Sequence, residues 1–207
     1  MIKAVVFDLD GVLVDATEWH YEALNRALRL FGFGIDRAEH LAQYNGLPTR
    51  VKLEMLSKQR GFPVALHPFV CEQKQIYTKE LIATRCREDF EKIYMLKELR
   101  ARGYRLAVAS NAVRATCELM LQCAGLMRHL EFFLSNEDTV RHKPDPEVYL
   151  KAFAVLGVDG SEVLVVEDAP HGVAAARVSG AHVLAVGGYG DVHIDAVLRR
   201  IAGCEQE

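Results

Sequence analysis

The feature that most constrains the fold is an apolar run at residues 4–7, which ends in the sequence Asp8-Leu9-Asp10-Gly11. Four β-rich apolar residues bounded by Asp and Gly predict a fully buried strand that runs into a tight turn. Successive side chains on a strand alternate between its faces, so Asp8 and Asp10 begin on the same side. Ligands bind at the carboxyl ends of strands in open α/β sheets, and the two aspartates therefore mark a candidate active site.

Two neighbouring carboxylates restrict the chemistry that we expect at this candidate site. They repel each other by roughly 4 kcal/mol at ~4 Å and an effective dielectric of about 20, unless a cation or a shared proton accompanies them. The pair thus predicts a metal ion, and it offers one nucleophile and one general acid/base. The string alone is also common in ordinary turns. A calcium-binding loop is excluded, because such a loop needs a Glu at its twelfth position, where this chain has Trp19.

From residue 87 onward, the patterns of strands and helices alternate. Strands are predicted at residues 104–109, 132–134, 163–166 and 183–186, and helices at residues 89–102, 113–123, 146–156 and 172–178. This alternation predicts a Rossmann-like, doubly wound α/β fold, in which helices cover both faces of a parallel sheet. The strand at residues 4–7 belongs to the same sheet.

The segment between the first strand and this alternation shows only helical patterns. Helices are predicted at residues 19–31, from residue 36, where Asp36 and Glu39 have the spacing of a capping box, at residues 49–61 and at residues 69–83. We therefore expect residues 16–86 to form a helical cap domain, inserted into a catalytic core of residues 1–15 and 87–207. The cap has a net charge of +3 and the core of −6. This split suits an anionic substrate, although solvated surfaces also differ this much by chance.

Three further polar sets lie at the ends of predicted strands or before the next helix. Ser110 and Asn111 follow the second strand, where a helix start favours anions, so Ser110 is a candidate phosphate ligand; a helix N-cap is the alternative. Lys143 lies on a loop that two prolines stiffen. Glu167 and Asp168 end a buried strand. A second acidic pair is costly unless it shares the first pair's cation, and Mg²⁺ needs only two or three protein oxygens.

In this order, the four sets resemble the motifs of the haloacid dehalogenase superfamily, in the branch with a helical cap after the first motif. Residues 8–15 match the first motif, Ser110-Asn111 the second, Lys143-Pro144 the third and Glu167-Asp168 the fourth. The resemblance covers the whole chain. It implies that Asp8 attacks phosphorus to form an aspartyl phosphate, and that Asp10 serves as general acid and then as general base.

The same resemblance implies a Mg²⁺ cofactor and a set of residues around it. Asp8, the backbone carbonyl of Asp10, and Asp168 would hold the ion, with Glu167 supporting them. Ser110, Asn111 and Lys143 would bind the phosphoryl oxygens, and Lys143 would also keep Asp8 ionised. Positioning and charge neutralisation carry most of such a reaction.

The residues of this chain also favour one class of reaction within the superfamily. True dehalogenases and phosphonate-cleaving members lack an Asp two residues after the nucleophile, so Asp10 implies a phosphoester substrate. Residues 18–21 resemble the β-phosphoglucomutases, in which the residue matching His20 takes part in gating the acid/base; the alternative is a histidine on one face of a helix. Gly46 and Arg50 lie in a segment similar to the substrate-reading loop of the family.

Two departures weaken the resemblance to the mutases. Arg50 is one place later than the mutase arginine, and Val113-Arg114 replaces the mutase Lys-Asn pair. We therefore expect a phosphatase that acts on a small phosphorylated metabolite, such as a sugar or polyol phosphate, with the mutase as the alternative. A non-enzymatic phospho-acceptor switch is the more remote alternative, because such receivers have no inserted helical domain.

Composition restricts the partners and the compartment. The net charge of −3 gives no general attraction to nucleic acid. No apolar run approaches the ~18 residues of a membrane span, and the first residues show no leader pattern. The five cysteines have no zinc-binding spacing, which favours a reduced compartment. We expect a cytoplasmic monomer whose partner is a small phosphate ester.

Overall fold

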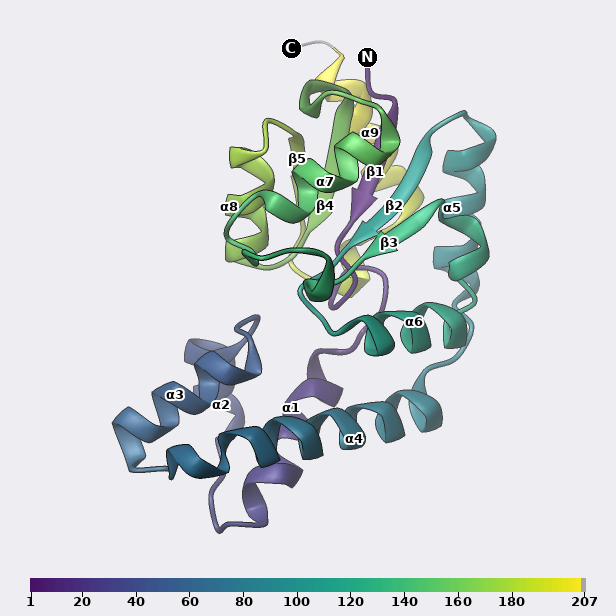
Figure 1. Cartoon of the computed structure of the whole chain (residues 1–207). Helices are drawn as coiled ribbons and strands as arrows, with labels where there is room; N and C mark the ends of the chain where they lie inside the picture. The colour runs from purple at the N-terminus through teal and green to yellow at the C-terminus, as the bar shows by residue number, and fades with distance from the viewer. Residues whose placement is uncertain (206–207) are drawn as a thin grey trace. The chain divides into compact units, whose positions relative to one another are not determined.

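The computed structural model describes residues 1–205, which divide into two compact units. Of these residues, unit 1 comprises Met1–Asp15 and the chain from Cys86 onward, and unit 2 comprises Ala16–Arg85. Figure 1 shows the chain with its helices and strands labelled. Among the described residues, no helix has the length and apolar character needed to cross a membrane.

Unit 1 is built on a five-stranded, fully parallel sheet. Its strands are β1 (Ala4–Phe7), β2 (Arg105–Ala109), β3 (Phe132–Leu134), β4 (Val163–Glu167) and β5 (His182–Ala185), in the spatial order β3-β2-β1-β4-β5. All four residues of β1 and all five of β4 are buried, as the apolar runs predict. The predicted α/β fold with a parallel sheet is therefore confirmed.

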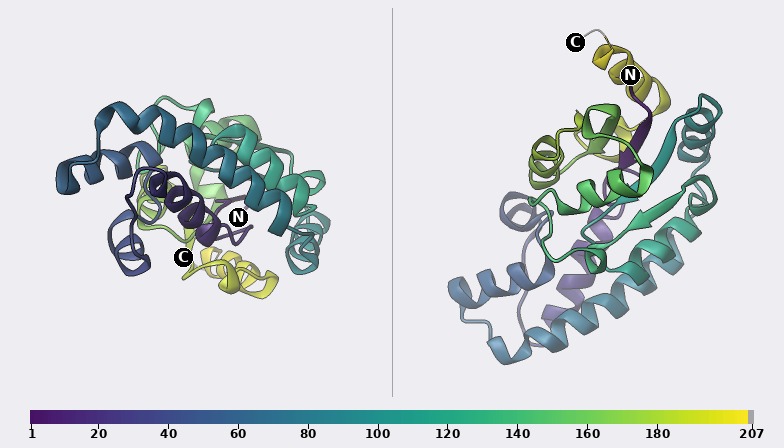
Figure 2. Two further views of the ribbon diagram at one scale, coloured as in Figure 1. Left: turned by 90° about the horizontal axis from the view of Figure 1, so that it is seen from below. Right: turned by 45° about the horizontal axis from the view of Figure 1, so that its top comes forward.

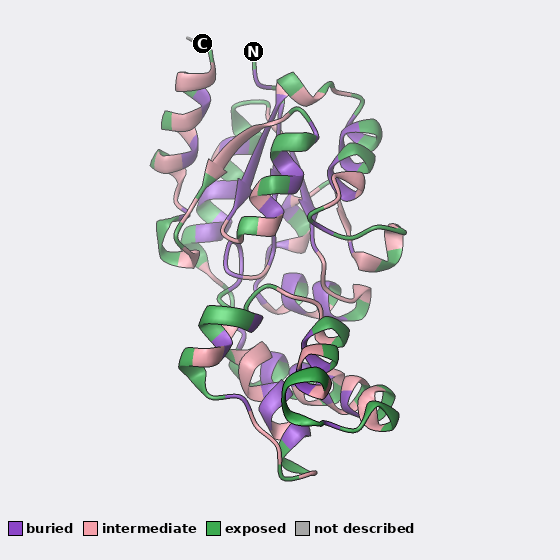
Figure 3. Cartoon of the chain, turned by 90° about the vertical axis from the view of Figure 1, so that its left-hand side faces the viewer, coloured by how far each residue is buried: buried purple, intermediate pink, exposed green. Residues whose placement is uncertain are grey.

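Helices cover both faces of this sheet. They are α5 (Phe90–Ala101), α6 (Arg114–Cys123), α7 (Glu147–Leu156), α8 (Pro170–Val178) and α9 (Ile194–Cys204). On one face, α7 and α8 pack against alternate strand residues such as Ala4 and Val6. The next residues of β1 point to the other face, where α5 and α9 contact each other (Figures 1 and 2). Figure 3 shows the central strands β1, β2 and β4 as largely buried, the edge strands β3 and β5 as mostly intermediate, and the helices of unit 1 with exposed outer sides.

Helix α9 lies beyond the last element that the sequence patterns predict. It buries Val197 and Ile201, four residues apart and hence on one face of the helix. The ring of His193 accepts a hydrogen bond from Ala196 N at 3.3 Å and caps its first turn. A short amphipathic helix of this kind closes the sheet face that would otherwise expose apolar residues.

Unit 2 consists only of helices and turns. Its main elements are α1 (Thr17–Arg29), α2 (Arg37–Glu39), the π-helical turn η1 (His40–Tyr44), α3 (Thr49–Arg60) and α4 (His67–Arg85). Asp36 caps α2 by accepting a hydrogen bond from Glu39 N at 2.8 Å, which is one half of the expected capping box. The Glu39 carboxylate does not return this bond but pairs with Arg60.

The core of unit 2 lies between these helices. Leu24 and Leu28 on α1 pack with Leu53 and Leu56 on α3 and with Tyr44. Helix α4, the longest of the chain's described helices, contacts both α1 and α3. Apolar residues at helical spacing thus bury one side of each helix and leave the other side exposed, as Figure 3 shows.

Candidate active site

The sheet topology places Asp8 where open α/β sheets bind ligands. Strand β1 lies in the middle of the sheet, with β2 and β3 on one side and β4 and β5 on the other (Figure 1). The direction of the connections thus changes at β1, and its carboxyl end is a topological switch point. Asp8 follows β1 directly, and its N–H donates to the Val166 carbonyl at 2.9 Å. The sheet therefore fixes the backbone of this residue.

The turn after Asp8 depends on a glycine. The Leu9 carbonyl accepts hydrogen bonds from Leu13 N and Val14 N, both at 3.0 Å, which closes the turn. Gly11 adopts a φ of +84°, a conformation that side chains with a Cβ disfavour. A Cβ atom at this position would also overlap the Asp168 carboxylate. The predicted Asp-Gly turn therefore allows the acids after β1 and β4 to approach each other.

Lys143 lies at the centre of the candidate site. Its Nζ donates to Asp8 Oδ1 at 2.6 Å, to Glu167 Oε1 at 2.6 Å and to the Ala109 carbonyl at 2.8 Å. An ammonium group has three donors, and these three bonds use all of them. The side chain is 1% exposed, so the ion pairs are shielded from water. The lysine thus neutralises Asp8, and a phosphoryl oxygen would have to share or replace one of its present acceptors.

Asn111 positions the loop that carries this lysine. Its Oδ1 accepts a hydrogen bond from Lys143 N at 3.1 Å, and its Nδ2 donates to the Lys143 carbonyl at 3.4 Å. Glu147 also holds this loop, because its carboxylate accepts hydrogen bonds from Val140 N and Arg141 N, each at 3.0 Å. Two hydrogen bonds of the Asn111 amide are therefore made to the backbone of Lys143.

Glu167 is held from three directions. Oε1 accepts from the Tyr149 hydroxyl at 2.7 Å as well as from Lys143, and Oε2 accepts from Ala169 N at 3.2 Å. The Tyr149 ring also lies 4.8 Å from the ammonium of Lys143, within cation–π range. A Cβ at Gly172 would overlap the Glu167 carboxylate, so this glycine makes room for it. Since its oxygens are occupied, Glu167 supports the site through Lys143.

Burial and like charges shift the pKa values of the site. Burial raises the pKa of Asp8 well above its usual range, and the charges of Glu167 and Asp10 add to the rise against the opposing effect of Lys143. Burial also raises the pKa of Asp168 to about 6, with a further contribution from Glu167. Burial alone would lower the pKa of Lys143, but the neighbouring carboxylates outweigh it and raise this pKa well above the ordinary value. The site thus has more negative charge than its one lysine balances.

The donor set fits a small divalent cation. Carboxylate oxygens of Asp8, Glu167 and Asp168 all lie within 4.8 Å of one another. Excess negative charge and oxygen ligands are what Mg²⁺ requires, and the ion keeps several waters when the protein supplies few oxygens. Lys143 bonds one oxygen of Asp8 and one of Glu167. The second oxygen of Asp8 and the carboxylate of Asp168 are therefore the candidate metal ligands. The acidic cluster therefore has the chemistry to bind a metal.

Ser110 and Asp10 complete the predicted set in unit 1. Ser110 follows β2 and is 1% exposed, with its N–H bonded to the Leu134 carbonyl at 2.9 Å. Its Oγ accepts a hydrogen bond from Ala112 N at 3.0 Å and also lies within hydrogen-bonding reach of the Cys117 side chain. Helix α6 begins after Val113 without a side-chain cap, and neither Ser110 nor Asn111 is its N-cap. Asp10 is half-buried in the turn after β1.

The predicted residues of unit 2 are not brought together. His20 Nδ1 lies 2.9 Å from Lys74 Nζ, whereas Gly46 is exposed in the turn after η1, with a φ of +74°. The Arg50 side chain is 84% exposed and forms an ion pair with Glu54 at 3.4 Å. His20 thus belongs to a half-buried polar pair, and Arg50 faces solvent.

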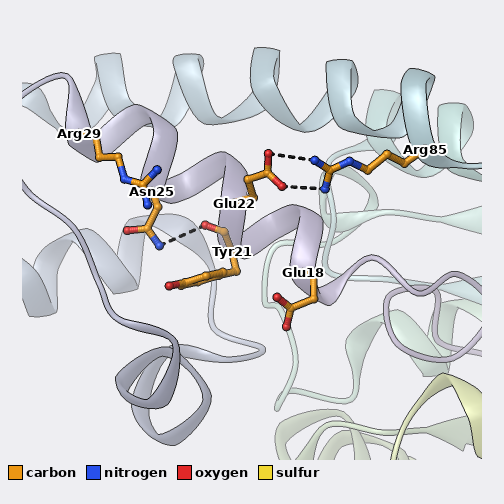
Figure 4. A pocket seen from close by; sticks show the side chains of 6 residues that line it. All are labelled: Glu18, Tyr21, Glu22, Asn25, Arg29 and Arg85. Carbon is orange, nitrogen blue, oxygen red and sulfur yellow. Dashed lines mark hydrogen bonds and ion pairs between the residues drawn. The ribbon is translucent and has the colours of Figure 1, made fainter.

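A cavity of about 220 Å³ also lies in unit 2 (Figure 4), and polar side chains that line it stabilise the fold of this unit. It is lined by Glu18, Tyr21, Glu22, Asn25, Arg29 and Arg85. Arg85 donates to both oxygens of Glu22 at 2.7 and 3.1 Å, as the dashed lines in Figure 4 show. Asn25 Nδ2 donates to the Ile35 carbonyl at 3.0 Å, which ties α1 to the segment before α2. Because these groups pair with one another, the cavity is a weaker candidate than the strand ends of unit 1.

Comparisons with known proteins identify the family of the chain. The family model described as haloacid dehalogenase-like hydrolase matches residues 5–186. A phosphoglycolate phosphatase of Cupriavidus necator is 32% identical over 186 residues, which cover 88% of this chain and 80% of that protein. A phosphorylated carbohydrates phosphatase of Thermotoga maritima is 28% identical over 195 residues, covering 93% and 86%. The crystal structure of β-phosphoglucomutase from Clostridium difficile has a TM-score of 0.83 over 100% of both chains at 20% identity, a likeness of fold.

Proposed function

Because the chain belongs to the haloacid dehalogenase-like hydrolase family, we propose that it is a Mg²⁺-dependent phosphatase that works through an aspartyl phosphate on Asp8. It is a phosphoric monoester hydrolase that acts on a small phosphorylated metabolite. We propose a sugar or polyol phosphate, or a closely related ester, as the substrate. In organisation, unit 1 is the catalytic core and unit 2 the cap that selects the substrate.

The observation that carries this proposal is the bridge formed by Lys143. Its ammonium joins Asp8 to Glu167 at 2.6 Å each, at the switch point of the sheet and beside Asp168. A carboxylate nucleophile must be ionised to attack, and burial among other acids works against this. The paired lysine supplies the opposing charge and bonds only one of the two oxygens of Asp8, which suits Asp8 to nucleophilic attack with the other.

The proposed reaction has two balanced steps. In the first, an oxygen of Asp8 forms a bond to phosphorus, the ester P–O bond breaks, and Asp10 gives its proton to the leaving oxygen. In the second, Asp10 takes a proton from water, whose oxygen bonds to phosphorus while the Asp8–phosphorus bond breaks. Inorganic phosphate leaves and Asp8 is restored. Ser110 donates its hydroxyl proton to a phosphoryl oxygen, which its burial and its hydrogen bond from Ala112 N orient it to do.

The bound Mg²⁺ would neutralise charge on the phosphoryl group. Asp8, the backbone carbonyl of Asp10, and Asp168 would hold the ion. Glu167 would act only through Lys143, because its oxygens accept from Lys143, Tyr149 and Ala169 N. For Asn111, we propose that it positions the backbone of Lys143 and so aids phosphate binding indirectly.

A phosphomutase is the second candidate, and two observations support it. The β-phosphoglucomutase structure matches this chain over its full length, and His20 is paired with Lys74 in the cap. A different contact favours the phosphatase. Arg114, which stands where the mutases have a Lys-Asn pair, is bound by both oxygens of Asp138 at 2.5 and 2.6 Å. This guanidinium is committed to the protein, so the hydrolase remains the proposal.

Phosphate release tests this proposal directly. The purified chain would be incubated with Mg²⁺ and a panel of sugar, polyol and nucleoside monophosphates that includes β-glucose 1-phosphate. We expect release from at least one ester, a loss of at least about 10⁴-fold in Asp8→Asn, and no change in Asp195→Asn, an exposed acid of unit 1. Conversion of β-glucose 1-phosphate to glucose 6-phosphate without release would favour the mutase. No turnover of either kind would contradict both.

A further inference from the structure

Cys117, on α6, contacts the turn that presents Ser110 to the candidate site of unit 1. The exposed fractions of these two residues are 0% and 1%. Burial raises the pKa of the Cys117 thiol, and the charges of Asp10 and Asp8 add to the rise, so the thiol is neutral at pH 7. The thiol thus lies within electrostatic range of both acids. The proposed reaction gives this buried group no role, although it lies beside residues that react.

Cys117, Ser110 and Ala112 form a closed set of hydrogen bonds. Ala112 N donates to Ser110 Oγ at 3.0 Å, and the Cys117 thiol donates to the Ala112 carbonyl at 3.7 Å. The third bond joins Ser110 to the Cys117 side chain and counteracts the rise in the pKa of the thiol. A bond that lowers the pKa of a thiol is donated to its sulfur, so the Ser110 hydroxyl donates to Cys117 Sγ. Each of the three residues thus donates one bond and accepts one within the set.

The backbone of this turn is held separately, by the segment around β3. Ser110 N donates to the Leu134 carbonyl at 2.9 Å, and Asn136 N donates to the Ala112 carbonyl at 3.0 Å. These bonds fix the point from which the Ser110 side chain extends. A hydroxyl group still rotates about its C–O bond, and backbone bonds do not set that rotation. The direction of the hydroxyl proton therefore depends on the sulfur of Cys117.

Sulfur is well suited to accept this proton in the free protein. A thiol is a weak acceptor, whereas the oxygens of a phosphoryl group are charged and accept hydrogen bonds that are roughly twice as strong as neutral ones. A phosphoryl oxygen that reaches Ser110 therefore replaces the sulfur as acceptor at a small cost. With a carboxylate in place of the thiol, the exchange would cost more, because a stronger bond would have to break.

We propose that Cys117 is a positioning residue of the phosphate site: its sulfur orients the hydroxyl of Ser110 in the free protein and yields it to a phosphoryl oxygen. No covalent bond changes, because the proton stays on Ser110 Oγ and only its acceptor differs. Every effect of Cys117 on phosphate binding therefore passes through Ser110. The inference rests on the proposed function, in which Ser110 binds the phosphoryl group, and it adds the residue that prepares Ser110 for that contact.

The S–H stretching band of Cys117 reports this contact directly. Infrared difference spectra of the parent chain against Cys117→Val isolate the band, since Val fills the site without a thiol. Neighbouring hydrogen bonds strengthen one another, so loss of the Ser110 bond should move the band to higher frequency. We expect that shift in Ser110→Ala, and in the parent chain on saturation with inorganic phosphate and Mg²⁺. In Ser110→Ala, phosphate should leave the band in place.

A double-mutant cycle distinguishes positioning from packing. Titration calorimetry with inorganic phosphate and Mg²⁺ measures the dissociation constant without any turnover. Cys117→Val should weaken phosphate binding by about three- to tenfold, and by less than about 1.5-fold when Ser110→Ala is already present. Cys123→Val, at a half-buried position of the same helix, is the matched control and should have no effect in either background. If Cys117→Val does not fold, as judged by circular dichroism, Cys117→Ala replaces it.

The possible outcomes differ for the two proposals. The inference is overturned, with the phosphatase intact, if Cys117→Val costs no affinity or costs the same affinity with and without the Ser110 hydroxyl. A Cys117 band that fails to respond to Ser110→Ala, or to phosphate, overturns it as well. Absence of phosphate release from every ester contradicts the phosphatase. Inorganic phosphate then still decides the inference: binding that shifts the band through Ser110 supports it, and absence of binding or of the shift overturns it.

Discussion

The two polar clusters of this chain, each within its own unit, differ in charge and in how far they are satisfied. In unit 1, acidic groups gather at strand ends around one lysine, and Lys143 uses every donor it has. In unit 2, His20, His40, Lys52 and Lys74 come from four helical elements, and His40 Nδ1 has no hydrogen-bond partner among residues 1–205. The strand ends of unit 1 thus hold their charged groups in a paired network, whereas the helices of unit 2 bury an imidazole nitrogen that has no such bond among the described residues.

The largest effect should follow the loss of the central cation of unit 1. In Lys143→Met, the carboxylates of Asp8 and Glu167 remain buried without their partner, so the free energy of unfolding should fall by about 3–5 kcal/mol. Urea denaturation without Mg²⁺ measures this. Lys151→Met removes an exposed ion pair with Glu147 and should cost less than about 1 kcal/mol. Equal losses in the two variants would mean that the lysine does not hold the site together.

The next effect tests how closely the acids of unit 1 approach each other. Gly11→Ala places a residue with a Cβ in the left-handed region of φ, which costs about 1–2 kcal/mol. It also displaces Asp168, so it should weaken Mg²⁺ activation by about 10- to 100-fold. Gly157→Ala at the end of α7 adds the strain alone, because nothing lies within 4 Å of its Cβ. The Mg²⁺ dependence of phosphate release distinguishes them. If it is unchanged in Gly11→Ala, Asp168 is not a ligand.

In unit 2, the pH dependence of stability should reveal that the His40 ring is buried in its neutral form. Its pKa is lowered to about 4 in the folded chain, against about 6.5 when unfolded. The unfolded chain binds the additional proton between these values, so this contribution to stability is present above pH 6.5 and is lost as the pH falls toward 4. Between pH 7 and pH 5 the loss is about 2 kcal/mol.

Urea unfolding at pH 7 and pH 5 measures this loss against two variants. His40→Asn lacks the titrating ring and should lose about 2 kcal/mol less than the parent chain between these pH values. His142→Asn, at an exposed position of unit 1, should behave as the parent does. A parent and a His40→Asn variant with the same pH dependence would show that His40 is not buried as a neutral ring.

The smallest effect concerns a single hydroxyl in unit 1. Tyr149→Phe keeps the ring beside Lys143 but removes the hydrogen bond to Glu167, which Lys143 and Ala169 N still satisfy in part. We expect a loss of about 1 kcal/mol in unfolding free energy. Tyr94→Phe, 55% exposed on α5, should be neutral within error. Neutral behaviour of Tyr149→Phe as well would remove Tyr149 from the set that positions the site.

Much of unit 1 was predictable because two simple rules govern it. Buried parallel strands appear as apolar runs, and their carboxyl ends meet at one edge of the sheet. These rules alone lead from the sequence to Asp8, Glu167 and Asp168 as neighbours, whereas Lys143, which lies on a loop, was assigned to the site through the family resemblance. The same rules do not indicate which partner each side chain takes. The amide of Asn111 binds the backbone of Lys143, 32 residues away, and no local pattern encodes that pairing.

Unit 2 was predictable only as a set of helices. Helical spacing shows which side of a helix is apolar, but not which residues of different helices meet. His40 and Lys52 therefore carried no signal in the sequence, and the π-helical turn that holds His40 has no recognised pattern. Arg50, singled out by its likeness to a family loop, is directed to Glu54. One pattern could have indicated them: a basic residue on an otherwise apolar helix face predicts a buried polar group, as an acid at a strand end does.

The most direct test of the central claim is chemical trapping of the phosphorylated residue. The chain would be quenched during turnover of a substrate found in the panel, reduced with borohydride and digested for mass spectrometry. An acyl phosphate on Asp8 is reduced to homoserine, so we expect this product in the peptide that contains residue 8 and not in Asp8→Asn. Modification at another residue, or an unmodified Asp8 under conditions of rapid phosphate release, would contradict the account.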